Sequence, residues 1–176
     1  RAFDVLMSLV LLIVALPIML LTAIAIRLED GFRAPVLYRQ TRVGLYNQPF
    51  EVLKFRSMIK NAETNGPVWA ATDDPRITKV GAFIRKARID ELPQLINVLR
   101  GDMSFVGPRP ERPEFVAQLA KCVPYYRSRH AVKPGITGWA QLCYSYGASD
   151  EDALEKLQYD LFYVKHRSLI FDLAIV

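Results

Sequence analysis

The stretch "RIDELPQLINVLRGDMSFVGPRP", residues 88–110, places two adjacent carboxylates among arginines. Asp90 and Glu91 lie between Arg88 and Arg109. The apolar residues that follow have the i, i+3, i+4, i+7 spacing of an amphipathic helix, and the proline in this run is compatible with a first helical turn, whose N–H groups have no helical partner. We therefore predict a helix that begins near Asp90 and ends at Gly101, with an apolar face made of Leu92, Leu95, Ile96 and Leu99.

The acid pair has a simple interpretation and a functional one. As an N-cap, Asp90 would contribute about 1 kcal/mol and nothing else. However, a helix start favours bound anions, and Arg85 and Arg109 are fork-shaped donors suited to phosphate oxygens. Asp90 and Glu91 together supply the carboxylates that Mg²⁺ commonly uses beside substrate phosphates. An ionised Asp90 next to a bound diphosphate is a competent nucleophile, so we predict a phosphate-handling site here.

Residues 5–26, "VLMSLVLLIVALPIMLLTAIAI", contain only Ser8 and Thr22 as polar residues. The run is longer than the apolar part of a signal peptide and has no small-residue cleavage site after it. A core helix is rarely apolar on every side in a domain of this size. Roughly 22 residues at about 1.5 Å each cover a hydrocarbon core of about 30 Å. This segment is predicted to be a membrane helix.

Pro17 lies in the middle of that helix. Proline has no N–H and its ring presses on the carbonyl of Ile13, so a kink or a break is expected. Membrane helices tolerate proline, which leaves a kinked span and a re-entrant hairpin both open. Basic residues flank both ends, which mildly favours two cytoplasmic ends. On the residues alone, the two topologies are evenly balanced.

The remainder has the character of a soluble domain. Strands are predicted at residues 36–40 and 50–58, joined in a hairpin by the turn residues of 44–49. In the second strand Lys54 and Arg56 face away from the apolar positions, and a solvated or a functional role stays open for them.

Beyond the hairpin, residues 61–75 are rich in turn residues, and Thr78 caps a predicted helix over 78–87. Residues 131–141 are predicted to be a Pro-Gly loop. Residues 154–176 are predicted to be helical and amphipathic, lying either on a bilayer surface or in the core. The fold class expected is α+β, mostly helical.

Composition narrows the function classes. The 176 residues suit one domain, and the start at Arg1 leads us to expect a portion of a longer protein. A net charge of +5 favours an anionic partner, but no nucleic-acid motif is present, so nucleic acid is not expected. Cys122 and Cys143 form no CxxC pattern and are expected to be buried free thiols in a reducing compartment. His130 and His166 are too few and too scattered for a zinc site or a catalytic triad.

At this point the residues match a family. "IDELPQLINVLRGDMSFVGPRP", with "LKFRSM" upstream and "KPGITGWAQ" downstream, resembles the bacterial monotopic phosphoglycosyl transferases, and the likeness runs from Phe3 to the C-terminus. The resemblance implies transfer of a phospho-sugar from a UDP-sugar to polyprenyl (undecaprenyl) phosphate with Mg²⁺, giving polyprenyl-diphosphate-sugar and UMP. Such enzymes start exopolysaccharide, lipopolysaccharide and glycoprotein assembly. The sugar itself is not specified by any motif.

The resemblance also assigns residues. Asp90 matches the nucleophile that forms a covalent phospho-sugar intermediate, and Glu91 its partner in the catalytic dyad, both near the metal. Arg85, Arg109 and Lys54 match basic positions near the phosphates. A further basic position of the family is Lys133, where many relatives have arginine.

The resemblance implies a topology as well. The family's first helix is re-entrant, broken at a Ser-Pro pair, and here the pair is Leu16-Pro17. With this likeness, we expect a re-entrant helix over residues 1–27, broken near Pro17, and a cytoplasmic catalytic unit with interfacial helices over 28–176. The protein would be monotopic, on the cytoplasmic face of the bacterial inner membrane. Its partners would be a UDP-sugar, polyprenyl phosphate and membrane lipid, and self-association into a homo-oligomer stays open. A membrane-attached diphosphate hydrolase and a non-enzymatic anchor are the rival interpretations.

Overall fold

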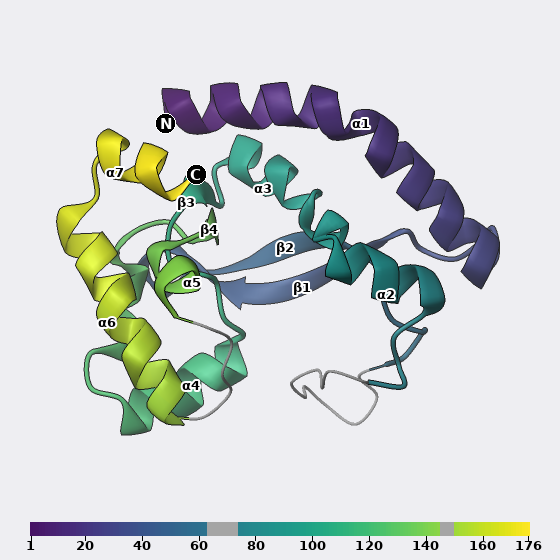
Figure 1. Ribbon diagram of the computed structural model, residues 1–176. Helices are drawn as coiled ribbons and strands as arrows, with labels where there is room; N and C mark the ends of the chain where they lie inside the picture. The colour runs from purple at the N-terminus through teal and green to yellow at the C-terminus, as the bar shows by residue number, and fades with distance from the viewer. Residues whose placement is uncertain (63–73, 145–149) are drawn as a thin grey trace.

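The computed structural model describes residues 1–62, 74–144 and 150–176, with the side chains of 150 and 151 left aside. The described chain is mostly helical, with two small two-stranded sheets (Figure 1). Its strands are β1 (Leu37–Val43), β2 (Pro49–Phe55), β3 (Ser104–Val106) and β4 (Gly135–Thr137). Its α-helices are α1 (Ala2–Asp30), α2 (Lys79–Lys86), α3 (Gln94–Arg100), α4 (Pro113–Cys122), α5 (Trp139–Cys143), α6 (Asp150–His166) and α7 (Leu169–Ile175).

The helix α1 is the one helix in the described residues that is long and apolar enough to cross a membrane, with a mean hydropathy of 3.0 over its most apolar window. It stays continuous through Pro17 and bends about midway along its length (Figure 1). Its N-terminal half runs along α3 and its C-terminal half along α2. Most of its apolar side chains remain exposed, because only one flank of the helix packs on the rest of the chain.

Both ends of α1 are fastened by polar contacts to that same body. At the N-terminal end, Arg1 donates to the carbonyls of Val98 and Leu99 at 2.7 Å each, which satisfies two carbonyls of the last turn of α3. At the C-terminal end, the carboxylate of Glu29 accepts from the backbone N–H groups of Lys79 and Val80 at 2.8 and 3.0 Å. The first turn of α2 is thus capped by α1.

The hairpin β1–β2 is antiparallel, with Leu37 opposite Phe55 and Val43 opposite Pro49. The two predicted strands are confirmed, with bounds shifted by a few residues. The turn between them is a short 3₁₀ segment, Leu45–Asn47, in which Tyr46 and Asn47 take positive φ values of 54° and 62°.

The two charged residues at the end of this hairpin are not solvated, which rules out that alternative. Arg56 is 8% exposed and bonds Asp30 at 2.6 Å, while the ammonium group of Lys54 reaches a buried carboxylate. Both charged side chains therefore form ion pairs within the folded protein.

The segment 131–141 was predicted to be a loop, and this prediction is wrong in part. Gly135–Thr137 forms β4, which pairs parallel to β3, and α5 begins at Trp139. The pairing depends on close backbone approach: a Cβ on Gly135 would lie 2.1 Å from the backbone nitrogen of Gly107. The result is a fixed position for the Gly-Pro-Arg-Pro corner that follows β3.

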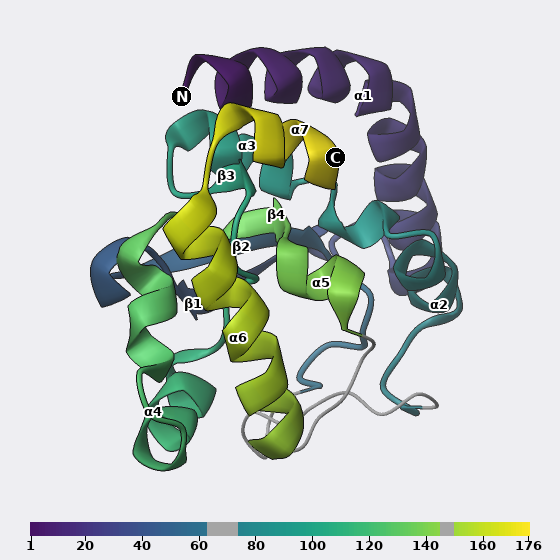
Figure 2. The same ribbon diagram turned by 60° about the vertical axis from the view of Figure 1, so that its left-hand side comes forward.

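The C-terminal region contains two helices where the sequence suggested one continuous stretch. After α6 the chain breaks, and the Ser168 hydroxyl accepts from Phe171 N–H at 3.2 Å to cap α7. Figure 2 shows α7 beside the N-terminal half of α1, where Phe171 and Ile175 share an apolar cluster with Phe3 and Met7.

The expectation of buried thiols is also wrong. Cys122 and Cys143 are free but exposed, since each ends a helix, α4 and α5 respectively, on an outward face. Neither thiol packs in the core.

Candidate active site

The acid pair lies in a tight turn between α2 and α3, not at the start of an α-helix as the sequence suggested. Residues Ile89–Glu91 form a 3₁₀ turn, which is entered through Arg88 at a left-handed φ of 58°. The N–H groups of Leu92 and Leu95 bond the carbonyls three residues before them, and α3 begins only at Gln94. The cap position of α3 is Pro93, which removes the interpretation of Asp90 as an N-cap.

Glu91 is the centre of a cationic cluster. Its carboxylate accepts from Lys54 at 3.2 Å and from both terminal nitrogens of Arg109, one of them at 3.3 Å, and Arg88 lies 3.7 Å away. Burial alone would raise the pKa of Glu91, but the charges of Arg109 and Lys54 lower it well below its ordinary value. Glu91 is therefore ionised at any physiological pH, and the cations around it outnumber it.

Asp90, the next residue, has the opposite electrostatic situation. The residue is 9% exposed, and its Oδ1 atom is buried with no hydrogen-bond partner among the described residues. Burial raises the pKa of Asp90, and the adjacent charge of Glu91 raises it further, while Lys54, Arg85 and Arg88 counteract part of the shift. A buried oxygen without a partner is energetically costly, which is typical of a group that meets a ligand.

Lys54 and Arg85 supply positive charge from two different elements. Lys54 comes from β2, and burial lowers its pKa against the opposing effect of Glu91. Arg85 comes from the last turn of α2, as predicted, and its charge acts on Asp90, although its guanidinium donates no hydrogen bond to a described residue. The structure thus brings Lys54, Arg85 and Arg109 around Asp90 and Glu91.

Arg109 is held by residues that the sequence did not single out. The guanidinium of Arg129 donates to the Arg109 carbonyl at 2.9 Å and pairs with the buried carboxylate of Asp160 on α6 at 2.7 Å. Arg42 donates to the carbonyl of Pro110 at 3.1 Å, on the other side of the corner. None of these contacts has a local sequence signature, because each partner lies tens of residues away. A small polar cleft next to Glu91 is lined by Arg42, Val52, Lys54, Gln94, Arg109 and Pro110.

Lys133 is not part of this group. Its ammonium nitrogen lies near Gly101, 3.5 Å from where a Cβ of that residue would stand. Gly101 ends α3, whereas the acid pair precedes it. The length of α3, at about 1.5 Å per residue, therefore separates Lys133 from the other predicted site residues.

The residues present are compatible with a magnesium ion, though not with a site made by protein ligands alone. The described residues contain no group of three or more His, Cys, Asp and Glu side chains that could enclose a metal. Mg²⁺, however, commonly takes only one or two carboxylates and completes its shell with water and substrate phosphates. The unpartnered Oδ1 of Asp90, beside the carboxylate of Glu91, fits that mode of binding.

Comparisons with known proteins match the whole chain. The model of the family described as "Bacterial sugar transferase" matches residues 1–176. The UDP-N-acetylgalactosamine-undecaprenyl-phosphate N-acetylgalactosaminephosphotransferase of Aeromonas hydrophila is 47% identical over 176 residues, which is all of this chain and 41% of that protein. The UDP-glucose:undecaprenyl-phosphate glucose-1-phosphate transferase of Escherichia coli (strain K12) is 44% identical over all of this chain and 38% of its own length.

This chain thus spans about two fifths of the length of those two relatives. A shorter relative, the exopolysaccharide production protein PSS of Rhizobium leguminosarum bv. phaseoli, is 41% identical and is covered over 90% of its length. The family model and these three relatives match over the whole of this chain, which includes the turn and the corner that hold the acid pair. The chain belongs to the bacterial sugar transferase family.

Proposed function

We propose that this chain transfers a sugar 1-phosphate from a UDP-sugar to undecaprenyl phosphate, releasing UMP, as the first step in assembling a bacterial glycoconjugate such as an exopolysaccharide. The observation that supports the proposal is the buried oxygen of Asp90, which has no hydrogen-bond partner among the described residues and lies beside a cluster of cationic side chains. The names of the relatives supply the substrate classes, since two of them are transferases that use undecaprenyl phosphate.

The proposed chemistry has two displacement steps at one phosphorus atom. A carboxylate oxygen of Asp90 attacks the phosphorus that bears the sugar, and the bond between that phosphorus and the bridging oxygen of UMP breaks, so UMP leaves with the electron pair. A phosphate oxygen of the lipid then attacks the same phosphorus and displaces Asp90. Each step forms one P–O bond and breaks one, which leaves the enzyme unchanged.

The cations around the acid pair give this route its electrostatic support. Arg109 and Lys54, which hold Glu91 in the free protein, would contact the diphosphate oxygens and offset the charge that develops during transfer. Arg85 would approach from α2. Asp90 and Glu91 would hold Mg²⁺ together with the substrate phosphates, and a bound Mg²⁺ would add positive charge that favours the ionised form of Asp90.

Intact-protein mass after mixing with a UDP-sugar and Mg²⁺, without lipid, tests the proposal. The wild-type chain should gain the mass of one phospho-sugar and release one equivalent of UMP. Asp90→Asn should do neither, because an amide is a very poor nucleophile, whereas Glu91→Gln should retain some adduct. Normal lipid-dependent turnover with no adduct on the wild type would mean direct attack by the lipid, and Asp90 would then act as a base or metal ligand.

We further propose that α1 enters the membrane and returns, with both ends on the cytoplasmic face. The contacts of Arg1 and Glu29 support this, because both ends of α1 bond to one compact body. The bend at mid-length is the feature expected of proline in a membrane helix.

Cysteine labelling tests this topology. The exposed Cys122 and Cys143 are first replaced by serine, and single cysteines are then placed at Ala2 and Arg33. Both should react with an impermeant maleimide only in inside-out vesicles. Reaction of either one in intact spheroplasts would establish a true span.

A further inference from the structure

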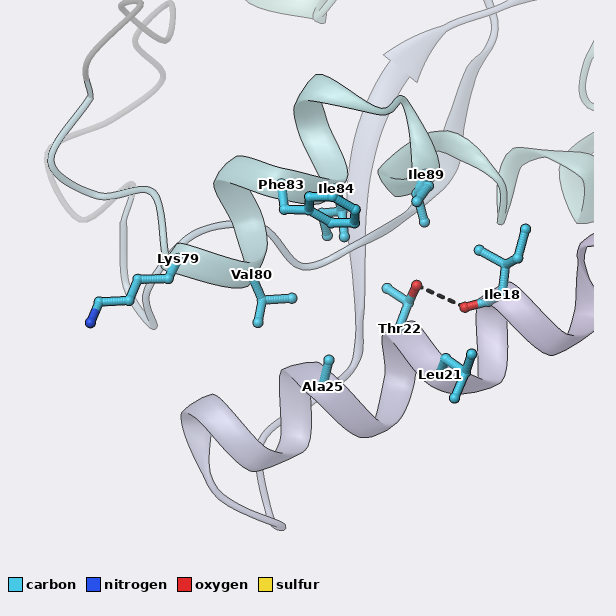
Figure 3. A pocket seen from close by; sticks show the side chains of 9 residues that line it. All are labelled: Ile18, Leu21, Thr22, Ala25, Lys79, Val80, Phe83, Ile84 and Ile89. Atoms are coloured by element: carbon cyan, nitrogen blue, oxygen red, sulfur yellow. Dashed lines mark hydrogen bonds between the residues drawn. The ribbon is translucent and has the colours of Figure 1, made fainter.

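An apolar groove separates the C-terminal half of α1 from α2, and its volume is about 500 Å³ (Figure 3). That volume lies within the range of ordinary ligand pockets, roughly 300–1,000 Å³. The one hydroxyl at its wall, that of Thr22, donates to the carbonyl of Ile18 at 2.8 Å and offers its proton to no ligand. The side chain of Lys79 points away from the groove at its outer end. The remaining walls are Ile18, Leu21, Ala25, Val80, Phe83 and Ile84.

Large apolar side chains are exposed around the groove. Phe83, on α2, is 66% exposed, and Leu21, on the largely exposed helix α1, is 67% exposed. Large apolar side chains exposed side by side around a hollow are typical of a binding surface rather than of a solvated face. Since the walls carry no free polar group beyond Lys79, the occupant must be apolar along its length.

The position of the groove indicates which apolar molecule fits. One wall is α1, the helix with the composition of a membrane segment. The inner end is Ile89, the residue before Asp90 in the same 3₁₀ turn, and Arg85 and Arg88 act on Asp90 from beside it. A molecule with a long hydrocarbon chain and an anionic head would therefore place its head at Asp90 when its chain lies in the groove.

We propose that this groove binds the phosphate-proximal part of the polyprenyl chain of the lipid acceptor and thereby aims the lipid phosphate at Asp90. The inference rests on the proposed function, which supplies the acceptor class. It adds a location: the acceptor enters between α1 and α2, through a groove that shares no lining residue with the polar cleft that contains Lys54 and Arg109. The sugar-nucleotide and the lipid would then reach Asp90 through separate openings.

Filling the groove tests the proposal in the full chain reconstituted in nanodiscs. Ala25→Phe places a ring inside the groove, whereas Ile24→Phe places the same ring at a neighbouring position of α1 that is 55% exposed and does not line it. Ala25→Phe should raise the KM for undecaprenyl phosphate at least tenfold and leave the KM for the UDP-sugar unchanged. Ile24→Phe should change neither. Equal acceptor KM values for the two variants would overturn the proposal.

Photolabelling of the wild type supplies a readout that needs no turnover and no variant. A polyprenyl phosphate with a diazirine in an isoprene unit near the phosphate should label peptides of residues 18–25 and 79–89, and unlabelled undecaprenyl phosphate should compete. Labelling elsewhere, or equal labelling by a diazirine phosphatidylglycerol that undecaprenyl phosphate does not displace, would overturn it. Competed labelling of the groove without any sugar transfer would instead retain the groove and remove the proposed function. Normal sugar transfer with labelling elsewhere would retain the proposed function and rule out the groove as the acceptor site.

Discussion

Two charged clusters stand on either side of Arg109, and they are built differently. Around Glu91, one carboxylate faces the cationic groups of Lys54, Arg88 and Arg109, and the side chains of Lys54 and Arg109 keep 19% and 26% of their surface exposed. Around Asp160, one carboxylate faces one guanidinium, that of Arg129, and the two side chains are only 4% and 7% exposed.

The difference separates a binding cluster from a supporting one. In the buried pair of Arg129 and Asp160 the two charges balance each other. Arg129 also donates hydrogen bonds to the hydroxyl of Tyr126 and the carbonyl of Arg109, so this pair is not arranged to bind a ligand. Among the described residues, the cluster at Glu91 has more cationic than anionic side chains next to a cleft, which favours binding of an anion from solution. Arg109 belongs to both: its backbone is held by the closed cluster and its side chain serves the open one.

The largest effect on stability is expected from breaking the buried ion pair of Arg129 and Asp160. Asp160→Asn leaves the guanidinium of Arg129 buried without a counter-charge, which should lower the free energy of unfolding by about 3–5 kcal/mol. Denaturant unfolding in detergent checks it. The control is Glu51→Gln, which breaks the pair with Arg39, where the side chains are 66% and 59% exposed. That change should stay within about 0.5 kcal/mol. Similar losses for the two variants would contradict the contrast drawn between buried and exposed pairs.

The next effect, on catalysis, concerns the cluster around Glu91. Arg109→Lys keeps the charge but loses the planar fork, so kcat/KM for the UDP-sugar should fall roughly 30-fold, equivalent to about 2 kcal/mol. Steady-state kinetics measures it, with the exposed Arg100→Lys as the matched control. Unchanged kinetics for Arg109→Lys would remove Arg109 from the phosphate contacts.

A smaller effect, of opposite sign, is expected from Asp90. Its folded-state pKa is raised, so ionisation costs stability above that pKa, and the cost disappears below the unfolded-state value near 3.8. Asp90→Asn should therefore stabilise the fold at pH 7, where the carboxyl of the wild type is ionised in the unfolded chain, and should not stabilise it at pH 3. Thermal unfolding at the two pH values distinguishes this from a gain that is independent of pH, which would disprove the assignment.

The smallest effect is expected from Lys133, at the far end of α3. Lys133→Ala should change kcat/KM for the UDP-sugar by less than about threefold, since α3, roughly 10 Å long at about 1.5 Å per residue, separates its charge from the acid pair, and screening is strong over a Debye length of about 10 Å. A loss comparable to that of Arg109→Lys would show that Lys133 reaches the substrate after all.

The sequence predicted best those elements whose structure depends on neighbouring residues. The periodicity of residues 78–87, the N-cap Thr78 and the hairpin are local signals, and the structure has all of them. The start of α3 was misjudged, because the pattern of apolar residues does not reveal that Arg88 takes a left-handed φ. The pairing of β3 with β4 was missed for another reason: strands of three residues carry no periodicity, and only the Gly107–Gly135 approach reveals them.

The candidate site divides in the same way. Asp90, Glu91 and Arg109 could be named from one stretch of sequence, and the structure brings them together. Arg129 and Asp160 could not, because their role comes from packing between α6 and a distant corner of the chain. The exposure of the two cysteines depends likewise on which helical face turns outward.

The fastening of α1 also governs the order of events during synthesis. Asp4 accepts hydrogen bonds from the Ser104 hydroxyl and the Phe105 N–H, partners 100 and 101 residues away in the chain. At a ribosomal rate of about 5–20 residues per second, the apolar helix emerges roughly 5–20 s before these partners exist. During that interval the residues of this chain that cover α1 in the folded protein have not been made, so α1 needs another cover, such as lipid or a chaperone. The rest of the described chain then packs against a helix that was made first.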